Sequence, residues 1–257
     1  DLLNQVVYAE TWERPELSPR DRSLITVAVG TALYASSEVR YHVGRALDNG
    51  VTQEEIMDQP GYDYHIDIPG TTIFDGKTLK GWTALPGGKW EVVDGAILGT
   101  SPKSERRHGI LLSDRQFTDF VVKAKFRVHQ GDSGFYFRAK RVKSGVSVHG
   151  FQVEVDTSQE TGGLYETGGR AWVHRPSAEV VKRRGYEKGQ WTDLELSATG
   201  GHLVVKINGV VSTELKNDRG RTKGHFGLQL HGGQEMRVEY KDIVIQELNS
   251  KAEPPKK

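Results

Sequence analysis

The chain has 257 residues, and its five tryptophans, nine tyrosines and eight phenylalanines supply enough apolar material for a substantial core. A formal net charge of +1 gives no electrostatic reason to expect a nucleic acid or an anionic membrane as partner. The absence of cysteine excludes disulfides, thiolate zinc sites and cysteine nucleophiles. No apolar run approaches the roughly 20 residues of a membrane-spanning helix. The start at Asp1, without methionine, leaves the compartment open, and we favour a bacterial periplasmic or secreted location over the cytoplasm.

Helix signals fill residues 1–60, which we predict to be a separate helical segment. Ser18 is the expected N-cap before Pro19, and Thr52 with Glu55 has the pattern of a capping box. The expected helices are one over 2–12, one that starts at Pro19, one over about 38–47, and a short one that starts after Thr52. A piece of this size cannot cover its own apolar stripes, so we expect it to pack against another subunit or against the rest of the chain.

Two runs in this segment carry a family resemblance: ETWERPELSPRDRSLITVAVGTAL and EVRYHVGRALDNGVTQEEI. They resemble the carboxymuconolactone decarboxylase and alkylhydroperoxidase-like family, over residues 1 to about 58. The resemblance places Glu10 and His42 where that family often carries a functional acid and histidine. The cysteine pair of the peroxidase branch is absent, and so are the helices that normally follow. Because the family implies packed helices, we expect an association module that makes the chain a homo-oligomer.

From residue 61 the pattern changes to short strands separated by glycine-rich turns. We predict a β-domain over 61–250 and a solvated tail over 251–257. Residues 120–129 alternate apolar and charged side chains, as a half-buried strand does. Asp94 and Asn208, each followed by glycine, predict tight hairpin turns. Ten or more strands without a convincing helix predict a two-sheet sandwich or jelly roll.

The stretch from Ser133 to Asp156 predicts a strand pair with one apolar and one polar face. Alternation places Phe135 and Phe151 on the core side, and the segment GLQLHGG at 227–233 repeats the pattern. The other face is rich enough in polar groups to hold a polar ligand, although an ordinary solvated sheet face has the same alternation. Its side chains are Tyr136, Arg138, Gln152, Glu154, Asp156, Gln229 and His231.

Seven blocks follow one another in this part of the chain: FDGKTLKGW, LLSDRQFTDFVVKAKFR, GDSGFYFRAK, HGFQVEVD, TGGLYETGG, GQWTDLELSATGGHLVVKINGV, and FGLQLHGG followed by VEYKDIVIQEL. In this order they resemble the 3-keto-disaccharide hydrolase family over about 64–250. The resemblance implies a concanavalin-like β-sandwich that acts on glycosides already oxidised at C3 of the sugar, as a 3-keto-glycoside hydrolase or 1,2-lyase. It also implies a separate NAD-dependent sugar 3-oxidoreductase that makes the ketone. The chain itself has no pattern for a nucleotide cofactor.

The polar face suits this chemistry. A ketone at C3 acidifies the proton on C2, so a base can remove it and expel the aglycone from C1, after which water adds back. Such a site needs a base and a group that stabilises the enolate. The catalytic candidates are His231, Glu154, Asp156 and Arg138, and the polar substrate-binding candidates are Tyr136, Gln152 and Gln229. We expect His231 to be the base, near Asp156, with Glu154 paired to Arg138. A divalent metal ion is the alternative stabiliser, with Glu154, Asp156 and His231 as its ligands.

The segment TGGLYETGGRAW predicts a flexible flap, because four glycines bracket Tyr165 and Glu166. These two residues are expected to close over the sugar, with Tyr165 and Trp172 as stacking platforms. The basic run from Lys182 to Lys188 is expected to be a solvated loop.

Two other functions remain open on the sequence. A non-catalytic carbohydrate-binding β-sandwich has the same fold, since fold alone does not fix function. A decarboxylase-like enzyme would instead act through Glu10 and His42. Release of the aglycone from a 3-keto-glucoside, but not from the unoxidised glucoside, distinguishes the first reading from both alternatives.

Overall fold

The computed structural model describes residues 16–32, 36–52, 55–56, 70–143 and 145–248. The chain divides into two compact units, Asp1–Gly70 and Thr71–Lys257. No described helix is long and apolar enough to cross a membrane. The expected helix over 2–12, the candidate acid Glu10 and the expected tail over 251–257 lie outside the described residues.

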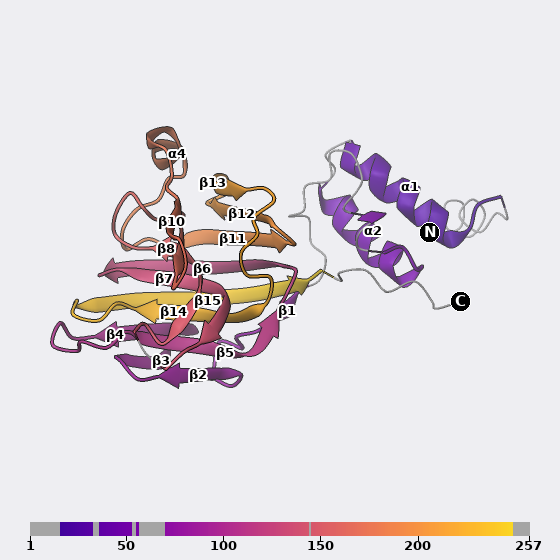
Figure 1. Ribbon diagram of the computed structural model, residues 1–257. Coiled ribbons are helices and arrows are strands. Elements are labelled where there is room, and N and C mark those ends of the chain that lie inside the picture. Colours follow the sequence, from indigo (N-terminus) through magenta and orange to yellow (C-terminus); the bar gives the residue numbers. More distant parts are fainter. Residues whose placement is uncertain (1–15, 33–35, 53–54, 57–69, 144, 249–257) are drawn as a thin grey trace. The chain divides into compact units, whose positions relative to one another are not determined.

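Two helices dominate the described part of the first unit: α1 over Pro19–Ala32 and α2 over Ser36–Asp48 (Figure 1). The predicted N-cap is confirmed, because the Ser18 hydroxyl accepts a hydrogen bond from the Asp21 backbone N–H at 3.1 Å. His42, the candidate of the decarboxylase reading, lies on α2. A small buried cluster holds the helices together: Val27, Val43, Ala46, Val51 and Ile56.

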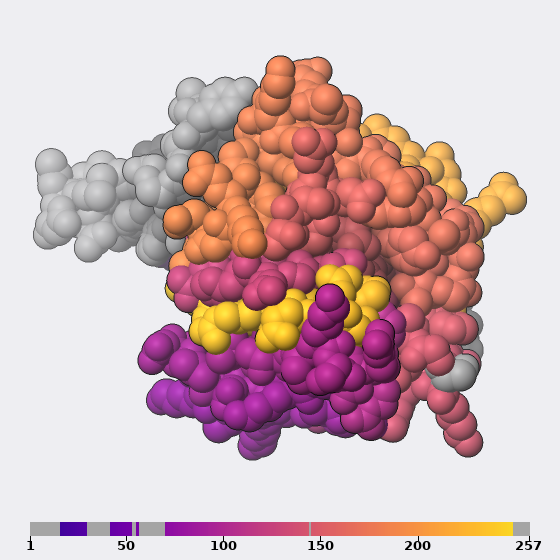
Figure 2. Space-filling model, turned by 90° about the vertical axis from the view of Figure 1, so that its left-hand side faces the viewer, coloured from indigo at the N-terminus to yellow at the C-terminus, as the bar shows by residue number. Residues whose placement is uncertain are grey.

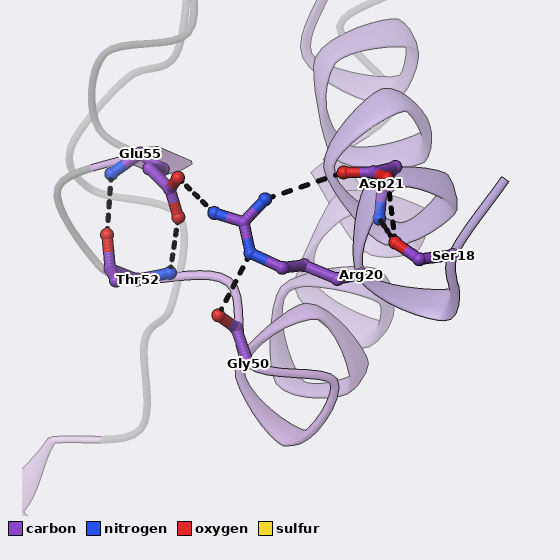
Figure 3. A network of polar contacts seen from close by, with 6 residues as sticks. All are labelled: Ser18, Arg20, Asp21, Gly50, Thr52 and Glu55. Atoms are coloured by element: carbon purple, nitrogen blue, oxygen red, sulfur yellow. Dashed lines mark hydrogen bonds and ion pairs between the residues drawn. The ribbon is translucent and has the colours of Figure 1, made fainter.

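Arg20 ties the start of α1 to the segment that follows α2 (Figure 3). Its Nε donates to the Gly50 carbonyl at 3.3 Å, and its guanidinium forms an ion pair with Glu55. The predicted capping box is confirmed in both directions, at 2.9 Å from the Thr52 N–H and 3.2 Å from the Glu55 N–H. The Thr52 backbone bond and then Arg20 lower the pKa of Glu55. One carboxylate thus caps the segment and holds it against α1.

The second unit is a sandwich of two antiparallel sheets, as predicted (Figure 1). In spatial order, the first sheet contains β13 (Val210–Leu215), β12 (His202–Ile207), β11 (Thr192–Thr199), β6 (Phe120–Gln130), β15 (Met236–Glu247), β4 (Ala96–Ser101) and β3 (Lys89–Val93), with β1 (Thr71–Thr72) also paired to β15. The second sheet contains β10 (Ala171–His174), β9 (Leu164–Thr167), β8 (Val148–Val155), β7 (Ser133–Arg141), β14 (Gly224–Leu230), β5 (Gly109–Phe117) and β2 (Trp82–Leu85).

The apolar faces of the two sheets meet in one core. Phe135, Phe151 and Leu228 of the second sheet lie in the same buried cluster as Phe126 and Tyr240 of the first, which confirms the predicted alternation. The predicted hairpin turns are also confirmed, since Asp94 and Asn208 both have φ of 49°.

Figure 2 shows the end of the sandwich at which β6 ends and β15 begins. The yellow β15 lies there between the magenta β6 and the purple β4, in the order of the sheet. Several connections meet at this end, because neighbouring strands run in opposite directions, among them residues 102–108, 131–132, 156–163 and 231–235. These connections shape the rim of the sites described below.

The alternation of β7 breaks at Arg138. This residue has φ of 48°, and the pairing of β7 with β8 shifts between Phe137 and Lys140, which is a β-bulge. The bulge takes the Arg138 side chain off the face that carries Tyr136. The prediction that these two side chains share one face is therefore wrong.

The Arg138 guanidinium is instead buried, with 1% of the residue exposed, among the turns at the end where β6 begins. It donates to the carbonyls of Thr118 at 2.8 Å, Gly200 at 2.8 Å and Arg221 at 3.0 Å. Its ion-pair partner is Asp119 at 3.0 Å, not Glu154 as predicted. Arg138 thus links three turns by hydrogen bonds and is not placed to act as a catalytic donor.

A stability measurement tests this role. Arg138→Ala leaves Asp119 and three carbonyls without their buried donor, so we expect the free energy of unfolding to fall by about 3 to 5 kcal/mol. Arg141→Ala, at an exposed position of the same strand, is the control and should change it by less than about 0.5 kcal/mol. Equal, small losses in urea unfolding of both variants would contradict the assignment.

Candidate active site

A cavity of about 430 Å³ lies on the face of the second sheet that is turned away from the core. Alternation along β7, β8 and β14 produces this face, because each lining residue there stands between two core residues. Seven predicted site residues line it: Tyr136, Gln152, Glu154, Tyr165, Trp172, Gln229 and His231. Four polar residues line it that the sequence did not single out: His108, Asp132, Glu160 and Thr167.

Strand register brings the floor of the cavity together. Tyr136 pairs with Gln152, and Gln152 pairs with Tyr165, so these side chains stand in one row across three strands. The row lies on the cavity side because Phe135, Phe151 and Leu164, one position earlier in each strand, point into the core. The sheet therefore presents two phenols and an amide as a rigid surface.

A chain of hydrogen bonds runs along this floor. The Gln152 amide nitrogen donates to Glu154 at 2.8 Å and lies 3.2 Å from the amide oxygen of Gln229. The Gln229 amide nitrogen donates to the Tyr136 hydroxyl at 3.4 Å, and that hydroxyl lies 2.8 Å from the hydroxyl of Thr167. Each polar group is held by a neighbour, so the floor is preorganised for a polar ligand.

Glu154 is protonated at neutral pH. Burial raises its pKa to about 9, and the negative charges of Asp132, Asp156 and Glu160 act in the same direction. Within the part of the chain that the structure describes, its carboxyl accepts the bond from Gln152 and forms no ion pair. A carboxyl in this state can donate a proton but cannot act as the base.

His231 has a lone pair available at Nε2. Its Nδ1 lies 2.9 Å from the Gly232 carbonyl oxygen. A carbonyl oxygen only accepts hydrogen bonds, so Nδ1 carries the proton of the neutral ring and Nε2 carries the lone pair. This tautomer has the lone pair that a general base requires.

His108 has the opposite arrangement. Its Nδ1 accepts a hydrogen bond from the Gly232 backbone N–H at 3.3 Å, so the proton of the neutral ring is on Nε2. Burial, and then the charge that the nearby His231 carries when it is protonated, lower the pKa of His108. The two rings meet edge to face with centroids 4.4 Å apart. Among the described residues, the cavity thus contains one imidazole whose Nε2 lone pair and one whose Nε2–H have no protein partner.

Sequence reasoning missed His108 because it stands before its strand rather than within an alternating run. Only the register reveals it, since Leu230 pairs with Gly109 and this places the flanking residues His231 and His108 side by side. Asp132 and Glu160 were missed for a similar reason, because both lie in connections between strands. Burial is the main factor that raises the pKa of Asp132.

Two predicted site residues do not line this cavity. The Asp156 carboxylate is held within its own turn, where it accepts hydrogen bonds from the hydroxyls of Thr161, at 2.6 Å, and Ser158. Glu166 lies on the opposite face of β9 from Tyr165 and forms an ion pair with Arg170. The roles predicted for both residues at the sugar are not supported by these positions.

The residues present do not fit the expected metal site. In the described segments, no three histidine, aspartate or glutamate side chains are placed to hold a metal ion. The predicted ligand set fails because Asp156 is engaged in its turn, whereas Glu154 and His231 line the cavity.

The glycine-rich segment forms a packed hairpin of β9 and β10 rather than the expected free flap. Tyr165 and Trp172 meet edge to face at 5.6 Å, and the Arg175 guanidinium lies 3.9 Å above the Trp172 ring. Gly168 has φ of 70°, and a Cβ there would lie 2.3 Å from the His149 ring. This glycine therefore serves close packing, and the hairpin is a fixed wall of the cavity.

The protonation of Glu154 predicts a pH-dependent stability. Its pKa in the folded state, about 9, lies above the ordinary value of 4.5. The contribution of this group to the free energy of unfolding is therefore fully present below pH 4.5 and is lost as the pH rises toward 9. Glu154→Gln keeps the acceptor for Gln152 but cannot ionise. The free energy of unfolding of Glu154→Gln, minus that of the wild type, should therefore increase by up to about 1.4 kcal/mol for each pH unit. Glu187→Gln, at an exposed position, is the control. Parallel curves for all three proteins would show that Glu154 is ionised in the fold.

Comparison with known proteins separates the two units. Residues 1–60 match the carboxymuconolactone decarboxylase family. Over 58 residues the chain is 36% identical to 4-carboxymuconolactone decarboxylase of Acinetobacter baylyi, a match that covers 23% of this chain and 43% of that protein. The chain thus spans less than half the length of this curated relative.

Solved structures share the sandwich fold. A Bacillus subtilis protein of unknown function with a galectin-like fold has a TM-score of 0.53 at 15% identity, over 66% of this chain and 90% of its own. The carbohydrate-binding module CBM66 from Bacillus subtilis has a TM-score of 0.51 at 14% identity, over 65% and 96%. A candidate glycosyl hydrolase from Parabacteroides distasonis has a TM-score of 0.50 at 18% identity, over 70% and 94%. At such identities the likeness shows the fold alone.

The family match of the second unit extends over residues 69–246, which is most of the chain and includes every residue that lines the cavity. The sandwich, its polar cavity and this match agree with one another. The chain belongs to the family of the 3-keto-alpha-glucoside-1,2-lyase-like domain.

Proposed function

We propose that the β-sandwich cleaves the glycosidic bond of 3-keto-glycosides, 3-keto-disaccharides included, by removal of the C2 proton, elimination of the aglycone and addition of water. One observation carries the proposal: a single cavity combines a buried neutral carboxyl, Glu154, with His231 and His108 in opposite tautomers. These groups are an acid, a base and a hydrogen-bond donor, which is the set that such an elimination requires.

The first step is proton removal. Nε2 of His231 takes the proton from C2, and the electrons of the C2–H bond form an enolate whose charge lies on the oxygen at C3. The Nε2–H of His108 donates to this oxygen as the charge develops, when the interaction contributes most to the rate. Asp132, which also lines the cavity, stabilises the imidazolium of His231 by its charge.

The second step is elimination. The enolate collapses to a ketone at C3 and a double bond between C1 and C2, and the bond from C1 to the aglycone oxygen breaks. Glu154 gives its proton to that oxygen, so the aglycone leaves as an alcohol. Water then adds at C1 while C2 regains a proton, which yields the free 3-keto sugar. Tyr165 and Trp172 contact the sugar from the hairpin wall.

The reaction needs a substrate that is already oxidised, because only the ketone makes the C2 proton acidic enough to remove. We therefore propose that a separate NAD-dependent sugar 3-oxidoreductase supplies it. The helical segment serves association into a homo-oligomer in this proposal, and the candidate catalytic groups all belong to the sandwich.

A non-catalytic sugar-binding sandwich is the second candidate function, and the likeness to a carbohydrate-binding module supports it. Sugar binding alone, however, requires no buried neutral carboxyl beside two histidines, and burying such a group costs free energy. The decarboxylase reading has less support, because the match covers 23% of this chain and 43% of that relative.

Loss of the base tests the mechanism. His231→Gln should lower kcat for aglycone release from a 3-keto-glucoside by about 100-fold or more and leave KM nearly unchanged. His202→Gln, at an exposed histidine of β12, is the control and should retain full activity. Unoxidised glucoside should not react with any of the proteins. Full activity of His231→Gln would overturn the assignment of the base, and binding without turnover by the wild type would favour the sugar-binding module.

The leaving group tests the acid. A nitrophenolate leaves without help, whereas an alkoxide needs a proton from Glu154. Glu154→Gln should therefore slow release of methanol from methyl 3-keto-glucoside by about 100-fold, but release of nitrophenol from the corresponding nitrophenyl glycoside by less than about tenfold. Equal losses on both substrates would show that Glu154 does not protonate the aglycone.

A further inference from the structure

A second hollow, of about 590 Å³, adjoins the candidate active site at the end of the sandwich where β6 ends and β15 begins (Figure 2). Asp132 and Glu160 line both hollows, so the two share a wall. The second hollow is open to solvent at the rim formed by the connections after β4, β6 and β8 and before β15. The two hollows are therefore adjacent.

The lining of this hollow is polar throughout. Among the described residues that line it, none is aliphatic or aromatic, and apart from two glycines each carries a polar or charged side chain. Four residues are acidic, Asp132, Asp156, Glu160 and Glu235, against one base, Lys103. Such a surface offers hydrogen-bond acceptors to hydroxyl and ammonium groups and nothing apolar for a hydrocarbon to contact.

The wall over 156–161 is held in place from behind. Arg184, of which 2% is exposed, donates to the carbonyls of Gln159 at 3.1 Å, Ser158 at 3.4 Å and Thr161. The Tyr186 hydroxyl donates to the Asp156 carbonyl. The expectation of a solvated loop over 182–188 is therefore wrong for Arg184. A wall fixed by a buried arginine is preorganised for a ligand rather than free to collapse.

We propose that this second hollow is the subsite for the aglycone, and that it selects a hydroxyl-rich leaving group that is neutral or cationic, such as a hexose or a hexosamine, over an apolar or an anionic one. The inference rests on the proposed function. The elimination breaks the bond between C1 and the aglycone oxygen, so a sugar ring in the first cavity must place its aglycone in an adjoining space. Of the four acids, Glu160 is ion-paired with Arg175 at 3.0 Å. The other three, against one lysine, favour an ammonium group and repel a carboxylate.

The test compares 3-keto-glucosides whose leaving groups are glucose, glucosamine or glucuronate, all linked through the same hydroxyl so that their basicity is matched. Cyclohexyl 3-keto-glucoside supplies an apolar group of similar size, and methyl 3-keto-glucoside supplies one too small to fill the hollow. We expect kcat/KM for glucosamine to exceed that for glucuronate by about tenfold or more, with the cyclohexyl compound no better than the methyl compound.

A charge reversal locates the effect. Glu235 is exposed at the rim of the second hollow and does not line the first. Glu235→Lys should reduce the preference for glucosamine over glucuronate by about tenfold and leave turnover of methyl 3-keto-glucoside within about twofold. Glu235→Gln, which keeps an acceptor for the Lys103 backbone N–H, should produce a smaller change in the same direction. Glu247→Lys makes the same charge change at the other end of β15 and should leave the preference unaltered.

The outcomes separate this inference from the proposed function. Turnover of methyl 3-keto-glucoside with equal kcat/KM for the three sugar aglycones would overturn the subsite and leave the proposed function standing. An unchanged preference in Glu235→Lys would also overturn it. Failure of the wild type to cleave any 3-keto-glycoside would overturn both.

Discussion

The two sheets can pack only through their apolar faces, and this constraint determines where every other feature lies. A strand has period two, so a residue next to one that points into the core must point away from it. With Phe135, Phe151 and Leu228 in the core, Tyr136, Gln152 and Gln229 emerge together on the outer face of the second sheet. The burial that stabilises the sandwich therefore also assembles the floor of the cavity.

A neutral carboxyl at pH 7 follows from the same packing. Glu154 is held at the cavity by its strand, near three other acids, and the buried Arg138 pairs with Asp119 rather than with Glu154. The bulge at Arg138 removes that cation from the cavity and uses it at the opposite end of the sandwich. One irregular residue thus joins the turns where β6 begins, whereas burial keeps Glu154 protonated.

The sequence predicted what depends on alternation and on turn chemistry, namely the sandwich, the hairpins at Asp94 and Asn208, and the row of polar side chains on β8 and β14. It did not predict what depends on register or on the connections. His108 becomes a neighbour of His231 only through strand pairing. The bulge at Arg138 could not be predicted, because the residue with positive φ there is not a glycine. The glycines of the β9–β10 hairpin predicted a flexible backbone. Gly168 instead packs against the His149 ring, where a side chain would not fit. The short helix α4 (Ala178–Arg183) was likewise not foreseen, because its six residues are flanked by a basic run typical of loops.

The central claim is that the C2 proton leaves before the glycosidic bond breaks. A 3-keto-glucoside labelled with deuterium at C2 tests it directly, with an enzyme-free sample as reference for spontaneous exchange. We expect slower aglycone release than from the unlabelled substrate, and a 3-keto sugar product that has lost the deuterium to the solvent. Release of the aglycone at the unlabelled rate, with the deuterium fully retained at C2, would contradict it.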